Sequence, residues 1–218
     1  MTDAPFQALV LRRDVHAARV GDDLVFLDVS ADAYSCLPSG AEAIDLRPDG
    51  SLAASASLAS QLLRAGLAQR NGSPPGPRAM PPPVRATLSP HTARPARPRH
   101  LPDIVAVTAD VLRHYRGRSF SEVLAAGRVS PRAGAAAEDL ATLVADFHAW
   151  IPWAPISGKC LIRSFVLRRW LARRGHATQW VFGVATWPFR AHCWLQSGDL
   201  ALDDVPERLQ AFERILVV

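Results

Sequence analysis

One cysteine, one histidine and two neighbouring aspartates in the last third of the chain could do chemistry together. Cys160 begins an apolar helical stretch, His192 lies in a strand-like run, and Asp203 and Asp204 close the next such run. These residue types supply a thiol nucleophile, its base and the carboxylate that orients the base. If the side chains meet in the folded chain, a cysteine hydrolase or an acyltransferase is expected.

The sequence around Cys160 favours a reactive thiol. Ser157 can cap a helix over Lys159–Arg174, which places Cys160 in the first turn. The free N–H groups and the positive dipole end of a helix N-terminus stabilise a thiolate, and Lys159, the only lysine of the chain, adds a positive charge. The alternative is a small buried hydrophobe, which is the commoner role of a single cysteine.

Strand alternation indicates which side chains can face the thiol. Within the run Ala191–Gln196, His192 and Cys193 point to opposite faces, so Cys193 is predicted to lie in the core. The tight turn that follows folds the next run back as a hairpin, which brings its end near the level of His192. Asp204 is the better match to the histidine, although the spacing leaves Asp203 open. Without the histidine, a solvated pair of aspartates ahead of a proline would be the simpler interpretation.

No metal or cofactor motif accompanies these residues. The other histidines do not recur at metal-ligand spacing and the sequence lacks CxxC and HExxH, so no metal is expected. The three cysteines lie far apart and do not make a disulfide framework. There is no apolar stretch of roughly 18 residues and no secretory pattern near the first residue. We therefore expect a cytoplasmic location and no membrane partner.

The net charge of +5 is unevenly divided along the chain. Residues 1–75 hold six arginines and nine acidic side chains, whereas residues 76–218 hold 19 basic and 11 acidic side chains. A basic region can attract nucleic acid, so a non-enzymatic winged-helix nucleic-acid-binding protein is one alternative. The winged-helix-like part would be the acidic one, however, which disfavours phosphate binding. No nucleic-acid partner is expected.

A proline-rich stretch divides the chain. Nine of the 18 prolines fall between Asn71 and His100, and this composition favours an extended spacer. We predict a small module over 1–72, a linker over 73–100 and a larger domain over 101–218. The elements predicted in the module are the strands Val15–Val20, Leu24–Val29 and Ala33–Leu37, a helix capped by Ser39, a helix capped by Ser51 or Ser57, and a short strand Leu67–Gln69. Three strands plus helices in so short a module indicate a winged-helix-like fold.

The larger domain places helices before strands. The predicted helices are Ile104–Tyr115, Ser121–Ala126, Glu138–Trp150 and Lys159–Arg174. The predicted strands are Thr178–Ala185, Ala191–Gln196 and Leu200–Asp203, in an antiparallel sheet. The whole chain is therefore predicted to be α+β. A cysteine on a helix, a histidine on a strand and an aspartate on the next strand follow the order of transglutaminase-like thiol enzymes.

Several runs of this domain resemble one family. They are Gly158–Ser164, Val181–Val184, Trp187–Trp194, Leu202–Arg208 and Ile215–Val218. With them the chain is similar to the B protein of lasso peptide biosynthesis, a leader peptidase of transglutaminase-like, papain-like cysteine peptidase fold. The resemblance implies that Cys160, His192 and Asp204 form its Cys-His-Asp triad, and it favours Asp204 over Asp203. The implied reaction is hydrolysis of one bond between the leader and the core of a precursor peptide.

The N-terminal module is similar, more loosely, to the precursor-recognition element of that family. The resemblance implies that an extended leader adds as a strand to an open sheet edge. The residues expected at this edge and on the helix beside it are Tyr34, Ser35, Cys36, Leu58, Leu62 and Leu63. For each leucine alone, a place in the core is the commoner role.

The family works with a lasso cyclase, an asparagine-synthetase-like protein that uses ATP. The present sequence has no P-loop or other phosphate cradle. No directly bound cofactor is therefore expected, and any ATP dependence is assigned to the cyclase partner. A transglutaminase or acyltransferase on the same three residues is the enzymatic alternative, because an amine could replace water as the acceptor.

Overall fold

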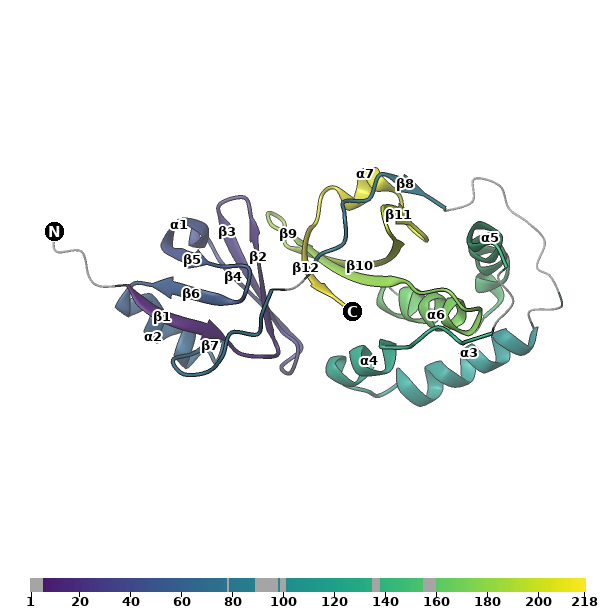
Figure 1. The fold of residues 1–218 in the computed structure, drawn as a ribbon, viewed down its shortest axis with the longest axis horizontal. Helices are drawn as coiled ribbons and strands as arrows, with labels where there is room; N and C mark the ends of the chain where they lie inside the picture. The colour runs from purple at the N-terminus through teal and green to yellow at the C-terminus, as the bar shows by residue number, and fades with distance from the viewer. Residues whose placement is uncertain (1–5, 78, 89–97, 99–100, 135–137, 155–159) are drawn as a thin grey trace. The chain divides into compact units, whose positions relative to one another are not determined.

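The structure, a computed structural model, describes residues 6–77, 79–88, 98, 101–134, 138–154 and 160–218 (Figure 1). These residues divide into two units. The first unit holds the described residues up to Met80 together with Val184–Arg190 and Glu213–Leu216, and the second holds those of Pro81–Gly183, Ala191–Phe212 and Val217–Val218. Each unit has its own cluster of buried apolar side chains.

A three-stranded antiparallel sheet in the first unit confirms three predicted strands. Its strands, in spatial order, are β2 (Val15–Val20), β3 (Asp23–Asp28) and β4 (Ala33–Leu37). All six residues of β3 are buried, because both faces of this central strand are covered. At the turn between β2 and β3, Gly21 has a φ of 59°, a left-handed conformation that glycine adopts without strain.

A second sheet in the same unit was not predicted. Its four strands, in spatial order, are β5 (Ile44–Leu46), β6 (Ser51–Ala54), β1 (Gln7–Leu11) and β7 (Ala68–Gln69), of which only β7 was expected. β5 and β6 are three and four residues long, and β6 is built of serine, leucine and alanine, so their sequences carry little strand preference. The winged-helix-like assignment therefore stays a prediction.

Two helices complete the described part of the first unit. Ser39 holds the N-cap position of α1 (Gly40–Ala43), as predicted, but with a left-handed backbone and without a side-chain cap bond. The predicted cap of α2 (Ala56–Arg64) was wrong, because Ser51 lies in β6, Ser57 lies inside the helix and Ser55 holds the N-cap position. α2 packs against β1, β6 and β7, all of which are labelled in Figure 1.

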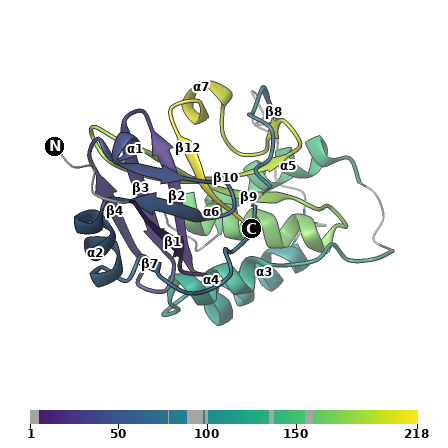
Figure 2. The ribbon, with the colours of Figure 1, turned by 60° about the vertical axis from the view of Figure 1, so that its left-hand side comes forward.

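The helices of the second unit follow the predicted order. They are α3 (Leu101–His114), α4 (Phe120–Gly127), α5 (Leu140–Trp150), the short 3₁₀ helix η2 (Ile151–Trp153) and α6 (Cys160–Arg173). Ser119 and Glu122 form a capping box at α4, and Asp139 caps α5. Both α3 and α4 pack against α6 (Figures 1 and 2). No helix in these described stretches is both long and apolar enough to cross a membrane.

The sheet that carries the candidate site has five strands. In spatial order they are β12 (Glu213–Val217), β9 (Gln179–Ala185), β10 (Arg190–Ser197), β11 (Leu200–Ala201) and β8 (Ala86–Thr87), and α7 (Pro206–Leu209) lies between β11 and β12 in the chain. The sheet departs from the prediction in three ways. β12 was not predicted. β8 comes from the stretch 73–100 that was expected to be a spacer, and it pairs with β11 in parallel. β11 also ends at Ala201, so both aspartates lie beyond it.

Candidate thiol active site

Cys160 is the first residue of α6, and its side chain is only partly exposed. One turn further along, Ser164 donates from Oγ to the carbonyl of Cys160 at 2.7 Å, and Trp180 donates from Nε1 to the same hydroxyl at 2.8 Å. These two hydrogen bonds connect the start of α6 to β9. The predicted cap and the lysine before Cys160 fall in 155–159, outside the described residues.

His192 lies near the start of β10 and is 8% exposed. Its ring stacks on that of Trp194, with centroids 6.2 Å apart, and packs in a tilted arrangement against the ring of Phe212, with centroids 5.3 Å apart. Trp194 in turn donates from Nε1 to Gln196 Oε1 at 2.9 Å. Alternate residues of β10 therefore share one face, and two aromatic side chains fix the orientation of the imidazole.

Asp204, rather than Asp203, contacts the imidazole. His192 donates from Nε2 to Asp204 Oδ2 at 2.5 Å. The other carboxylate oxygen of Asp204 accepts from the backbone N–H of Val205 at 2.9 Å, and its carbonyl accepts from the hydroxyl of Thr87 at 2.6 Å. The side chain of Asp203 turns instead to partners on α5 and α6.

Two neighbours hydrogen-bond to the thiol of Cys160. The hydrogen bond from the Cys193 thiol lowers the pKa of Cys160 most, followed by those from the His192 ring and from the backbone N–H of Cys193. Together these bonds outweigh burial and lower the pKa of Cys160 to about 4. Because it donates to Cys160 and is buried, the Cys193 thiol has its pKa raised well above the ordinary value.

Opposite charges around His192 favour its protonated form. Burial alone would lower its pKa, but the Asp204 carboxylate and the Cys160 thiolate raise it to about 9. Burial would likewise raise the pKa of Asp204, and the bond from His192 outweighs that effect and lowers it. At neutral pH the three groups therefore form a thiolate, an imidazolium and a carboxylate. Since Nε2 faces the carboxylate, Nδ1 is the ring nitrogen left for the thiol.

Sequence reasoning missed two residues near the thiol. Cys193 is 5% exposed, as a core residue should be, but its sulfur also lies 3.4 Å from Ser164 Oγ beside the nucleophile. A sequence signal for this contact was present. Ser164 lies one helical turn after Cys160 on the helix face that meets the sheet, so a sheet residue beside Ser164 also lies near the thiol. Tyr115, which follows α3, is the second: burial raises its pKa, and the charges of Cys193 and Cys160 raise it further.

The residues expected to bind a leader do not all meet in one place. Tyr34, Ser35 and Cys36 lie on β4, an outer strand of the three-stranded sheet, and the ring of Tyr34 packs on Phe189 with centroids 5.4 Å apart. Leu62 is 4% exposed and belongs to the apolar core of the first unit. Leu58 and Leu63 are partly buried against that core.

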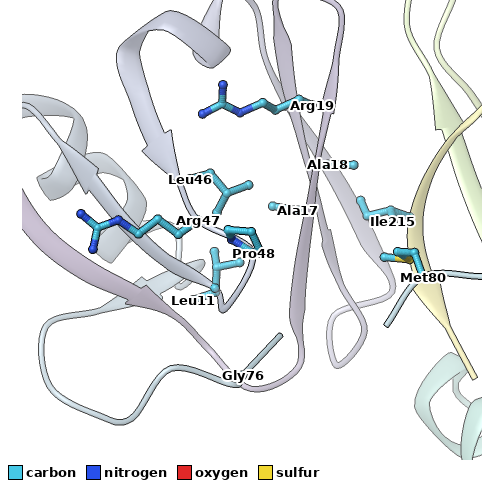
Figure 3. A pocket seen from close by; sticks show the side chains of 11 residues that line it. Leu11, Ala17, Ala18, Arg19, Leu46, Arg47, Pro48, Gly76, Met80 and Ile215 are labelled. Carbon is cyan, nitrogen blue, oxygen red and sulfur yellow. The ribbon is translucent and has the colours of Figure 1, made fainter. Parts of the chain in front are cut away.

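A pocket of about 270 Å³ in the first unit lies elsewhere (Figure 3). Its lining is Leu11, Ala17, Ala18, Arg19, Leu46, Arg47, Pro48, Gly50, Gly76, Met80 and Ile215. None of the six predicted leader-binding residues lines this pocket. Across the part of the chain that the structure describes, no group of three or more His, Cys, Asp or Glu side chains is placed to hold a metal ion.

The comparison with known families agrees with the architecture of the second unit. Residues 103–217 match the model of the transglutaminase-like superfamily. The match spans more than half of the chain, so the chain belongs to that superfamily, which includes cysteine peptidases and acyltransferases. Neither a curated protein nor a solved structure matches the chain.

Proposed function

We propose that this chain is the leader peptidase of lasso peptide maturation, with Cys160 as nucleophile, His192 as acid and base, and Asp204 as the group that orients His192. The observation that carries the proposal is the contact of His192 with both the Cys160 thiol and the Asp204 carboxylate. Membership of the transglutaminase-like superfamily supports a thiol enzyme. The resemblance of five sequence runs to the lasso B protein supports the particular substrate.

The proposed reaction has two halves. The Cys160 thiolate attacks the carbonyl carbon of the bond between leader and core, and the C–N bond breaks as His192 delivers its Nδ1 proton to the leaving amine. A thioester joins the leader to Cys160. Neutral His192 then takes a proton from water, which attacks the thioester, and the leader leaves as a carboxylate. The thiolate and imidazolium are regenerated. Stabilisation of the oxyanion is assigned to the backbone N–H of Cys160, at the start of α6.

Recognition of the precursor is assigned to the first unit. An extended leader would add to the outer edge of β4, where the backbone N–H and C=O groups of an edge strand can pair with another chain. Tyr34, Ser35 and Cys36 would supply this edge. Because Leu62 lies in the core, Leu58 and Leu63 are the two of the three predicted leucines that remain partly exposed for contact. The lasso cyclase is the proposed partner, and any ATP dependence is assigned to it.

The decisive experiment first looks for a short precursor gene beside the gene of this chain, and then incubates the full chain with the encoded peptide. Mass spectrometry should find one new pair of peptide ends with the native chain and none with Cys160→Ala, while Cys160→Ala still binds the precursor. Arg118→Gln, which breaks an exposed pair with Glu122 outside both the thiol site and β4, is the control and should still cut. Equal cutting by Cys160→Ala, or no short precursor gene nearby, overturns the proposal.

The same incubation tests the transferase alternative, which the superfamily match also allows. A fluorescent primary amine is added in excess over the precursor. If amine appears on the new carboxyl end or on a glutamine side chain, and its incorporation needs Cys160, the chain is an acyltransferase. If water alone is the acceptor, the peptidase assignment stands.

A further inference from the structure

A second carboxylate beside the candidate triad is bound to the helix of the nucleophile. Arg163 lies three residues after Cys160 on α6, and it donates from Nη2 to Asp203 Oδ1 at 2.8 Å and from Nε to Asp203 Oδ2. Asp203 is the neighbour of Asp204 in the chain. The two consecutive aspartates thus bind different partners: one bonds α6 and the other bonds His192.

The Arg163–Asp203 pair is partly buried, and both side chains have further partners. The side chain of Asp203 is 11% exposed, and His148 on α5 places Nε2 2.9 Å from its Oδ1. Arg163 also lies over the ring of Phe147, 5.5 Å from the centroid. Burial alone would raise the pKa of Asp203, but the bonds from His148 and Arg163 lower it. A buried carboxylate with two such partners is ionised and fixed in direction.

We propose that Arg163 and Asp203 are positioning residues that hold the backbone carrying Asp204 against the helix carrying Cys160. The proposal deepens the proposed function, because it assigns what aligns that same site. A planar guanidinium bonded to both oxygens of a carboxylate fixes distance and angle together. The contact therefore sets the acid of the triad relative to the nucleophile.

The local backbone shows why such a contact is needed. β11 ends at Ala201, so no strand pairing holds the backbone at Asp204. Backbone bonds that hold this segment include the one from the Thr87 hydroxyl to the Asp204 carbonyl and the one from Leu202 N–H to the Leu195 carbonyl at 3.0 Å. Catalytic groups need to be held within about 0.5 Å of the productive geometry, and loops alone rarely achieve this.

Charge substitution distinguishes positioning from simple electrostatics. If Asp203 acted only through its charge, Asp203→Asn would lower the pKa of Cys160, because a negative charge near the thiolate is removed, and Arg163→Gln would raise it. If the pair positions Asp204, both variants release the carboxylate from His192. The imidazolium is then less favoured, and the pKa of Cys160 rises in both variants. The titratable and charged groups facing this network are His148, Cys193, Tyr115 and Arg208, which all variants retain.

The experiment measures alkylation of Cys160 by iodoacetamide against pH, resolved by mass spectrometry. Both variants should raise the midpoint by about one pH unit, the size expected when a close opposite charge is lost. Arg163→Lys, which keeps the charge and loses the planar fork, should raise it partway. Arg118→Gln, which breaks an exposed pair with Glu122, is the matched control and should leave it unchanged.

The outcomes separate this proposal from the proposed function. Opposite shifts in Asp203→Asn and Arg163→Gln, or no shift in folded variants, overturn the positioning role. Thermal melting of each variant identifies loss of fold, and Arg163→Lys keeps the test valid if a neutral variant does not fold. Because alkylation needs no peptide substrate, a shift in both variants supports the positioning role even if the native chain fails to cut the precursor.

Discussion

The imidazole of His192 lies between two partners, with Nε2 2.5 Å from Asp204 Oδ2 and the thiol of Cys160 as its other hydrogen-bond partner. This order sets the tautomer, because a proton held on Nε2 by the carboxylate leaves Nδ1 to exchange a proton with the thiol. The carboxylate therefore acts on the thiol through the ring.

Replacing Asp204 tests that relationship. Asp204→Asn keeps the size of the side chain but removes the charge that raises the pKa of His192. We expect the rate constant for precursor cleavage to fall by about 10²–10⁴-fold, the range for loss of general acid–base function. Single-turnover cleavage measures it. Asp199→Asn, in the turn between β10 and β11, is the control, and a fall of the same size there would count against a specific role for Asp204.

The pKa values of Cys160 and His192 predict the pH dependence of cleavage. The ion pair exists above the pKa of Cys160, about 4, and below that of His192, about 9. The value of kcat/KM should therefore form a plateau between these limits. It should fall on the acid side as the thiolate gains a proton and on the alkaline side as the imidazolium loses one. A single rise near the ordinary pKa of a thiol, with no alkaline fall, is the result that the ion pair does not permit.

Cys193 supplies the largest of the bonds that stabilise the thiolate. Cys193→Ala removes its thiol and keeps its backbone N–H, so the pKa of Cys160 should rise by about one unit or more. Cys193→Ser keeps a side-chain donor and should raise it less. The titration of Cys160, followed by alkylation, checks both variants. Identical midpoints in alanine and native chains would show that the bond between the thiols contributes nothing.

Gly183 on β9 leaves room for the rings that hold His192. A Cβ there would lie 2.8 Å from Phe212 Cβ and 2.8 Å from Trp194 Cζ3, closer than real contacts allow. Gly183→Ala should lower the free energy of unfolding by about 1–3 kcal/mol, the usual cost of overpacking. It should also slow cleavage, because Trp194 and Phe212 both contact His192. Denaturant unfolding and single-turnover kinetics measure the two effects, and an unchanged stability would contradict this packing.

The sequence predicted those parts of the fold whose pattern is local. The bounds of β2 and β4 were predicted residue for residue, because β-branched and apolar runs between turn residues mark a strand. α3 to α6 followed from helical spacing and caps. β8 was missed because proline-rich surroundings hide a two-residue strand, whose pairing with β11 is visible only in space.

The site was only partly predictable, because its contacts join residues that are far apart in the chain. The types Cys, His and Asp could be selected, but alternation could not separate Asp203 from Asp204, since both lie beyond the end of β11. The contact of Cys193 with the thiol and the bonds of Arg163 to Asp203 join elements far apart in the chain. No spacing rule in a single sequence marks such pairs.

The mechanism depends on Cys160 being a thiolate that is paired with the His192 imidazolium and is stabilised in part by it. Alkylation of Cys160 against pH in the native chain and in His192→Ala tests it most directly, with Cys36 as an internal reference, since desolvation and the charge of Asp23 raise its pKa. We predict a midpoint at about 4 for native Cys160, moving in His192→Ala toward the ordinary thiol value of about 8.5. A native Cys160 that titrates together with Cys36, unchanged by His192→Ala, would show that no such ion pair forms.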